Sequence, residues 1–316
     1  MNALLLFDNF KLRFEQIITP LKNENEELIE VQATGIGGSE YLGYKNPGIR
    51  PLPNIMGHGI TGITEDGKRI AVYPLVSCEK CEYCKIDLLQ LCDNWKLIGV
   101  QLNGGFAEKV VVPKKSIFKI PDDLCWEQSS FIEPFANSVN AWELAKIEHK
   151  QQVLIIGAGS LGLGLIFCAK DSKHKNYAIL ENSKARNQIA IEAGAKAINE
   201  LSFELFDIVF DTVGTTETRI EAFKRVKKNG KCVYLGFAEP KQEIIFSEFI
   251  RKQIQFIGSF IYSTKQFEKA IHLAKFTKGE WVKNLSFTEV EEQLQCYLNG
   301  DFSTIKAVLR PNGINN

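Results

Sequence analysis

The stretch VLIIGAGSLG, from Val153 to Gly162, decides the fold of this chain. It joins a short β-branched run to a glycine-rich turn, and a helix is predicted to follow from Leu163 to Lys170. Tyr177 to Leu180 is predicted to be a second strand, which ends directly before Glu181. Glycines at the first, third and sixth positions of such a turn are typical of a dinucleotide-binding βαβ unit.

Each glycine of the turn has its own expected role. Gly157 permits the tight turn, Gly159 lets the backbone approach a pyrophosphate, and Gly162 lets the helix pack on the strand. Ser160 and Leu161 complete the turn, and the N-terminus of the helix that follows offers free N–H groups and the positive end of its dipole to phosphates. The alternative is a loop that simply needs small residues, but the order of strand, helix and acid favours a cofactor site.

The acid after the second predicted strand indicates which cofactor binds. Glu181 lies 19 residues after Gly162, where its carboxylate can accept hydrogen bonds from both adenosine-ribose hydroxyls. The same negative charge repels a 2′-phosphate, so the sequence favours NAD over NADP. Arg186 is a nearby cation that weakens this preference.

Length and composition describe an ordinary globular chain. Its 316 residues suggest about two domains. The chain has 38 basic and 38 acidic side chains, and this balance does not recommend a nucleic-acid or membrane partner. The N-terminus lacks the basic start of a signal peptide, and the uncharged run from Val153 to Ala169 is at the short limit for a membrane span. We therefore expect a cytoplasmic protein that binds a small molecule.

Four of the eight cysteines fall within 15 residues, at Cys78, Cys81, Cys84 and Cys92. The spacing C-x2-C-x2-C-x7-C lets the thiolates converge on one ion, and zinc prefers a closed tetrahedral site of this kind. The sequence therefore predicts a structural zinc in a lobe at about residues 76–96. An iron–sulfur cluster is the main alternative, although the bacterial motif has different gaps and a following proline. Reactive or incidental thiols are the other alternative.

Two kinds of segment follow one another along the chain. The first, to about residue 145, is rich in short strands, and Asp66-Gly67 predicts a hairpin turn of type I′. A helix is expected from about Trp126 to Leu144, continuing past Pro134. From about Lys150 to Gly279 strands and helices alternate, which favours an α/β fold with a parallel sheet. Further strands are expected at Phe206–Val213, Lys231–Phe237 and Gln253–Phe260.

The glycine turn, the four clustered cysteines and several further motifs together resemble those of the zinc-type alcohol dehydrogenases, a family of the medium-chain dehydrogenase/reductase superfamily. The motifs are GIGGSE (35–40), MGH (56–58), NGGFAE (103–108), IEP (132–134), DTVG (211–214), GSF (258–260) and VLRP (308–311). They are most similar to those of the sorbitol, polyol-phosphate and threonine dehydrogenases. The resemblance implies a GroES-like β-rich catalytic domain from residues 1–149 and 281–316, and a Rossmann NAD-binding domain at 150–280. It also implies a homodimer or tetramer.

The family normally holds a second, catalytic zinc, and two of its ligand positions differ here. Gly37 stands at the position of a Cys ligand, and Gly59 stands at the Glu of the G-H-E motif. His58 and Glu133 remain as possible ligands, and Glu40 could join them if it swings inward. Because a catalytic zinc needs about three protein ligands, the resemblance implies a degraded site with or without a residual zinc.

The candidate catalytic residues follow from the same resemblance. Ser39 occupies the family's proton-relay position, beside His58 and Glu133. Without zinc, His58, Tyr41 or Tyr44 is the candidate acid in the reductive direction. The structural alternatives are that His58 is a hydrogen-bonded residue at a strand end and that Glu133 is a helix carboxylate paired with a cation.

Three functions stay open, in this order. The first is an NAD-dependent dehydrogenase that transfers hydride between a secondary alcohol or polyol and NAD. The second is a metal-independent NAD(P)H reductase of an activated C=C, C=N or C=O bond. The third is a dinucleotide-binding protein without catalytic activity.

Overall fold

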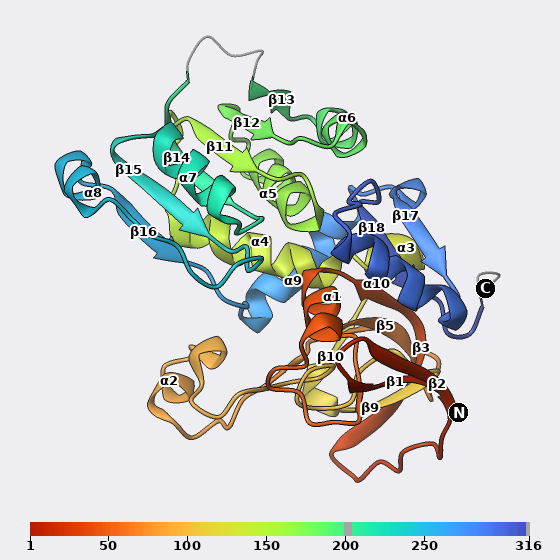
Figure 1. Ribbon diagram of the computed structural model, residues 1–316. Helices are drawn as coiled ribbons and strands as arrows, with labels where there is room; N and C mark the ends of the chain where they lie inside the picture. The colour runs from red at the N-terminus through yellow and green to blue at the C-terminus, as the bar shows by residue number, and fades with distance from the viewer. Residues whose placement is uncertain (199–203, 314–316) are drawn as a thin grey trace. The chain divides into compact units, whose positions relative to one another are not determined.

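The computed structural model describes residues 1–198 and 204–313 of the chain. The chain divides into two compact units, whose elements are labelled in Figure 1. Unit 1 comprises Met1–Glu133 and Ser263–Asn316, and unit 2 comprises Pro134–Tyr262. The domain limits expected from the sequence, 150 and 280, differ from this division and stay a prediction.

Unit 2 contains a six-stranded parallel sheet with the order β13-β12-β11-β14-β15-β16. Counted along the chain from β11, this is the order 3-2-1-4-5-6 of the doubly wound Rossmann fold, so the predicted fold class is confirmed for this unit. Figure 1 shows the strands side by side, with helices packed against them. The strands are β11 (Val153–Ile156), β12 (Tyr177–Leu180), β13 (Lys196–Ala197), β14 (Phe206–Asp211), β15 (Val226–Tyr234) and β16 (Gln255–Gly258). The helices are α4 (Ile132–Ala145), which begins at the boundary of the units, α5 (Ser160–Asp171), α6 (Lys184–Glu192), α7 (Thr216–Arg225) and α8 (Phe246–Lys252).

The strands of unit 2 lie close to where the sequence predicts them. β11 and β12 have the predicted bounds, and every residue of β11 is buried, as expected of a central parallel strand. β14 ends at Asp211, earlier than predicted. The Asp211 carboxylate accepts hydrogen bonds from the backbone N–H groups of Val213 (3.0 Å) and Gly214 (2.9 Å), which turns the chain out of the sheet.

Unit 1 is built on a seven-stranded sheet to which both ends of the chain contribute. Strand β18, from the C-terminal segment, pairs antiparallel with β3 and parallel with β17. The strands of this sheet are β3 (Glu26–Ile36), β5 (Gly59–Thr64), β6 (Arg69–Val72), β9 (Lys109–Pro113), β10 (Ile117–Lys119), β17 (Val282–Leu285) and β18 (Lys306–Leu309). A three-stranded sheet contains β1 (Asn2–Asp8), β2 (Lys11–Gln16) and β4 (Asn54–Ile55). A two-stranded sheet contains β7 (Leu75–Val76) and β8 (Lys96–Leu97). The helices are α1 (Gly38–Lys45), α2 (Glu82–Lys85), α3 (Trp126–Ser129), α9 (Thr264–Ala274) and α10 (Val290–Leu298).

A partly buried ion pair holds the C-terminal strand in the sheet of unit 1. Arg310 follows β18 and is only 3% exposed. Its Nε donates to the carbonyl oxygen of Gln32 (2.7 Å), and its Nη1 pairs with the Glu127 carboxylate at 2.6 Å. These contacts fix β18 beside β3, because the Arg310 guanidinium is buried and depends on them for its partners.

Two local predictions in unit 1 and at its boundary were wrong. The helix expected from Trp126 to Leu144 is two helices, α3 and α4, and Pro134 lies in the first turn of α4. A proline is tolerated there because the first N–H groups of a helix have no intrahelical partner. In the hairpin between β5 and β6, Gly67 has a positive φ of 80° but Asp66 does not. A type I′ turn requires positive φ at both central residues, so the turn is of another type.

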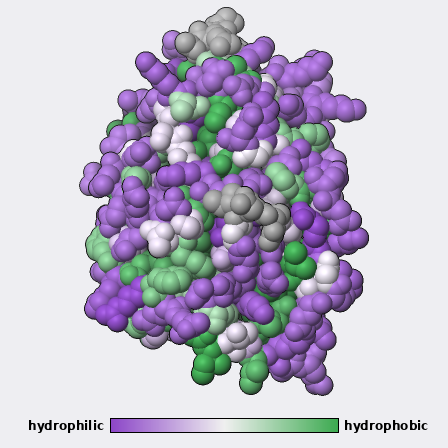
Figure 2. Space-filling model, turned by 90° about the vertical axis from the view of Figure 1, so that its right-hand side faces the viewer, coloured by the Kyte–Doolittle hydropathy of each residue, from purple (hydrophilic) through white to green (hydrophobic). Residues whose placement is uncertain are grey.

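The described residues contain no helix with both the length and the apolar composition needed to cross a bilayer. Figure 2 shows one face of the molecule, on which hydrophobic residues occur in small groups among hydrophilic ones. Exposed hydrophobic residues also occur on and beside α8, where Ile245 and Phe246 are each 64% exposed and Ile250 is 66% exposed.

Candidate functional site

The glycine turn between β11 and α5 leaves no room for side chains at two positions. Gly157 has a φ of 92°, in the left-handed region that favours glycine. A Cβ at Gly162 would lie 1.9 Å from the carbonyl oxygen of Gly157, so helix and turn are in direct backbone contact. These are the turn and the close packing that the sequence predicts for Gly157 and Gly162. The role of Gly159 beside a pyrophosphate stays a prediction.

The N-terminus of α5 is suited to an anion. Its N-cap residue is Gly159, which has no side chain to accept hydrogen bonds from the first-turn amides at Ser160 and Leu161. The helix dipole adds partial positive charge at this end. The guanidinium of Arg186 adds a full positive charge close to the turn. Its Nη1 lies 3.5 Å from the position that a Cβ at Gly159 would occupy. The turn can therefore receive a phosphate group.

Glu181 is tied directly to the glycine turn. One carboxylate oxygen accepts a hydrogen bond from the N–H of Ala158 (2.7 Å), and the other accepts from the N–H of Ser183 (2.7 Å). Each carboxylate oxygen can accept more than one hydrogen bond, so acceptor capacity remains for ribose hydroxyls. The sequence places Glu181 at the end of β12, but the bond to Ala158 depends on how the strand meets the turn.

The four clustered cysteines converge in unit 1. Their Sγ atoms all lie within 4.8 Å of one another, in the segment around α2. Backbone N–H groups of Lys80 and Cys81 lower the pKa of Cys78 to about 6, and the thiolate is the form that binds metals. Four sulfurs on a tetrahedral zinc are each about 2.3 Å from the metal, which this spacing can satisfy. The residues present therefore fit a closed structural zinc site.

His58 lies between two carboxylates in unit 1. Its Nδ1 is 2.6 Å from Oε1 of Glu40, and its Nε2 is 3.4 Å from Oε2 of Glu133. Glu40 occupies the first turn of α1, and its second oxygen accepts from the N–H of the N-cap residue Gly37 (2.9 Å). The structure thus brings the candidate residues His58 and Glu133 together, and adds Glu40 on the opposite edge of the ring. We call these three side chains the His58 cluster.

The two carboxylates favour the charged form of the ring between them. Burial opposes the imidazolium, but Glu40 and Glu133 outweigh it and raise the pKa of His58 to about 10. Burial likewise opposes the Glu40 carboxylate, but His58 outweighs it and lowers the pKa of Glu40 to about 2. Both nitrogens of an imidazolium are donors, so each carboxylate meets an N–H group.

Sequence reasoning missed two cations beside the His58 cluster. Lys306 on β18 is 5% exposed, and burial lowers its pKa while Glu40 and Glu133 oppose that shift. The guanidinium of Arg50 is attracted to the Glu40 carboxylate, and its Nη2 donates a hydrogen bond to the carbonyl oxygen of Ser39 (3.2 Å). A lysine in an otherwise apolar buried strand was the available signal for Lys306. Arg50 lies in a loop whose sequence carries no comparable signal.

The remaining catalytic candidates have different surroundings. Ser39 is exposed in the first turn of α1, and among the described residues no hydrogen bond is seen between its hydroxyl and His58. Tyr41 packs against the rings of Tyr297 and Phe302. The Tyr44 hydroxyl, in contrast, donates to Glu291 on α10 (2.6 Å).

Tyr44 is unsuited to the role of a catalytic acid. Its side chain is 1% exposed, and its hydroxyl also accepts a hydrogen bond from Gln295 (3.0 Å). Burial and the Glu291 contact raise the pKa of Tyr44 to about 12. The suggestion that Tyr44 serves as the acid was therefore wrong, because the residue anchors α1 to α10.

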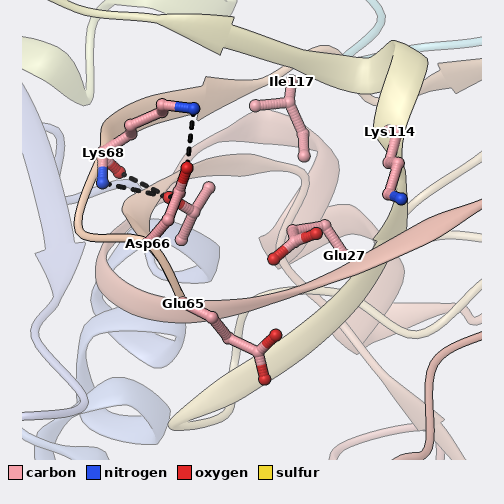
Figure 3. A pocket seen from close by; sticks show the side chains of 7 residues that line it. Glu27, Glu65, Asp66, Lys68, Lys114 and Ile117 are labelled. Carbon is pink, nitrogen blue, oxygen red and sulfur yellow. Dashed lines mark hydrogen bonds and ion pairs between the residues drawn. The ribbon is translucent and has the colours of Figure 1, made fainter.

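Unit 1 has a hollow of about 560 Å³ that none of the candidate site residues lines. Figure 3 shows the side chains around it. Its lining is strongly charged, but Lys68 pairs with Asp66 at 2.6 Å, and Glu65 pairs with Lys22, which lies outside the lining. Lys114, which also lines the hollow, donates a hydrogen bond to the carbonyl oxygen of Glu24 (2.8 Å). The hollow therefore gathers none of the candidate catalytic residues.

Two family models match most of the chain. Residues 23–122 match the alcohol dehydrogenase GroES-like domain, and residues 154–275 match the zinc-binding dehydrogenases. The chain is 27% identical over 293 residues to L-galactonate-5-dehydrogenase of Escherichia coli, covering 85% of this chain and 86% of that protein. It is 26% identical over 275 residues to galactitol 1-phosphate 5-dehydrogenase of Escherichia coli, covering 78% and 79%.

A solved structure shares the fold over almost the whole length. The crystal structure of an Escherichia coli alcohol dehydrogenase in complex with NADH matches this chain with a TM-score of 0.87 at 25% identity. The match covers 98% of this chain and 99% of that one.

The cysteine cluster makes a direct prediction about zinc content. Cys84→Ser removes one of four ligands, so zinc bound by the purified chain should fall from one ion to nearly none, as measured by native mass spectrometry. Cys296→Ser is the matched control, because Cys296 is half-buried on α10, outside the cluster. Retention of a full zinc ion by Cys84→Ser would contradict the assignment of this ligand.

Proposed function

The chain belongs to the zinc-type alcohol dehydrogenase family of the medium-chain dehydrogenase/reductase superfamily, and we propose that it is an NAD-dependent polyol dehydrogenase. The reaction is hydride transfer between a secondary alcohol, or its ketone, and NAD. The observation that carries this proposal is the glycine turn between β11 and α5. The Glu181 carboxylate accepts a hydrogen bond from the N–H of Ala158 in this turn.

In this proposal the dinucleotide lies against the glycine turn of unit 2. The first-turn amides at Ser160, Leu161 and Gly162 bind the pyrophosphate, and Gly159 leaves the backbone accessible. The Glu181 carboxylate accepts the ribose hydroxyls and disfavours a 2′-phosphate. Arg186 supports the phosphate side of the site.

The names of the relatives support a polyhydroxylated substrate. One relative is a dehydrogenase of L-galactonate and another of galactitol 1-phosphate, and both substrates are open-chain polyols that carry an anionic group. Secondary hydroxyls of such chains are the groups that a dehydrogenase of this family would oxidise. We therefore propose a polyol, polyol phosphate or sugar acid as substrate.

In this proposal Ser39 and the His58 cluster handle the proton of the reaction. When bound, NAD supplies the acceptor for the hydride that leaves the alcohol carbon. The hydroxyl proton is released in the same oxidation, and the exposed Ser39 hydroxyl passes it toward solvent. In the reductive direction Nε2 of His58, whose contact with Glu133 is long (3.4 Å), donates its proton to the carbonyl oxygen while Glu40 holds the ring at Nδ1. The cysteine cluster would hold a zinc that stabilises its lobe and takes no part in this chemistry.

We also propose that copies of the chain associate in the cytoplasm. β16 is an edge strand, whose unpaired N–H and C=O groups can pair with another copy. The exposed hydrophobic residues beside it, Ile245, Phe246 and Ile250, would be covered by that contact. Reducing conditions in the cytoplasm would keep the cluster thiols available for zinc.

If copies associate through this surface, charged substitutions on it should lower the mass of the particle in solution. Phe246→Lys with Ile250→Lys should convert a dimer or tetramer into monomers in size-exclusion chromatography with light scattering, because a charged surface resists burial. The control is Ile191→Lys, since Ile191 is also exposed (37%) but lies on α6. A wild-type chain that runs as a monomer would refute the proposal.

The proposed reaction is tested by turnover. With NAD and a panel of polyols, polyol phosphates and sugar acids, the purified protein should form NADH, followed by absorbance. His58→Ala should lower kcat/KM on the best substrate by about 100-fold or more, the usual scale of acid–base catalysis. His149→Ala, an exposed residue, should have no effect. Binding of NADH without turnover across the panel would favour the non-catalytic alternative instead.

The position of Glu181 predicts the coenzyme preference. Glu181→Gln removes the charge that repels a 2′-phosphate, so the ratio of the Kd for NADPH to the Kd for NADH should fall by about tenfold, which is 1.4 kcal/mol. Fluorescence titration measures both constants. Glu192→Gln removes a negative charge at the other end of α6 and should leave the ratio unchanged. An equal ratio in Glu181→Gln and wild type would show that Glu181 does not face the ribose.

A further inference from the structure

The His58 cluster offers too few donors on one side of the ring for a catalytic zinc. Such a site needs about three protein ligands that converge on one point. Nε2 of His58 and Oε2 of Glu133 are 3.4 Å apart, a spacing that two ligands of one zinc can have. Glu40 lies at Nδ1, on the opposite edge of the ring, and its second oxygen is bonded to Gly37. The expectation that Glu40 could swing inward as a third ligand therefore has no support in this arrangement.

The two glycines at the family's ligand positions have space for side chains that would supply the missing donors. A Cβ at Gly37 would have Oε2 of Glu40 at 3.7 Å and Nζ of Lys306 at 3.9 Å as its nearest neighbours. A Cβ at Gly59 would have Cβ of Glu133 at 3.6 Å. These are ordinary contacts, and neither glycine has a positive φ. Among the residues that the structure describes, only the four cysteines form a convergent group of three or more possible ligands.

The charge balance around Gly37 also favours a site without a second zinc ion. The ammonium of Lys306 lies beside the position where the family has a thiolate, and Arg50 adds a second positive charge facing Glu40. These cations already balance the Glu40 and Glu133 carboxylates, so without the thiolate the cluster has no surplus negative charge to stabilise a buried dication.

We propose that the His58 cluster works without a metal ion, and that Lys306 is a positioning residue which balances the buried Glu40 carboxylate behind His58. The protein then binds zinc at its four cysteines alone. The inference rests on the proposed function for the catalytic role of the cluster, but metal content tests it without any turnover. Failure of the polyol panel and failure of this inference are therefore separate results.

The first test is the zinc content of the purified full-length chain after dialysis against a weak chelator, measured by native mass spectrometry. The wild type should hold one zinc per chain, and His58→Ala and Glu133→Gln should hold the same amount. Two zinc ions in the wild type, falling to one in His58→Ala, would overturn the proposal.

The second test restores the missing donors. Gly37→Cys combined with Gly59→Glu supplies a thiolate and a carboxylate at the family's two missing ligand positions, so this variant should bind two zinc ions per chain. The matched control is Gly38→Cys with Gly59→Glu, because Gly38 is exposed in the next position of the chain. If the Gly37 variant still binds one ion, missing donors are not what excludes the metal, and the argument fails.

The third test addresses Lys306 itself. In the Gly37→Cys, Gly59→Glu background, Lys306→Met should tighten binding of the second zinc by about tenfold, because one opposing buried charge is removed. Lys306→Arg keeps the charge and should not tighten binding. A purely structural role of Lys306 would move stability in both variants but would not produce this charge-dependent gain, and its absence would reject the assigned role.

Discussion

The structure of unit 2 depends on one close backbone approach, between the carbonyl of Gly157 and the first turn of α5 at Gly162. A Cβ at Gly162 would lie 1.9 Å from the carbonyl oxygen of Gly157, far below any allowed contact. Strand, turn and helix can therefore meet in this way only with glycine at position 162. This contact sets where α5 begins and where its dipole points. It also places the Ala158 N–H so that Glu181, from the next strand, can bond to it.

Unit 1 is organised differently, around buried charge. Both ends of the chain meet in its sheet, and the pair of Arg310 with Glu127 fixes β18 there. The same strand carries Lys306 into the surroundings of Glu40, and Glu40 holds the ring of His58 from behind. Buried groups of this kind are costly unless each has a partner of opposite charge. The arrangement of cations around Glu40 is therefore a condition for a functional His58.

Features encoded by short spacings could be predicted from the sequence. The strands β11 and β12, the glycine turn and the convergence of the four cysteines all depend on residues close to one another in the chain. Pro134 indicates a helix start close to α4, although it lies two residues after the first residue of the helix, Ile132.

Features that depend on distant residues could not be predicted. Lys306 and Glu40 come from opposite ends of the chain, and only the pairing of β18 with β3 brings them together. The side of the His58 ring on which Glu40 lies follows from the start of α1 over Gly37, which the motif alone does not specify. The resemblance identified the missing ligands, but what surrounds them is a property of the folded chain.

The central claim is that unit 2 binds a dinucleotide at the glycine turn. The most direct measurement is calorimetric titration of the purified chain with NADH. The account predicts saturable binding of one NADH per chain, competed by NAD. An isotherm without saturable binding, from a chain shown to be folded by circular dichroism, would contradict it.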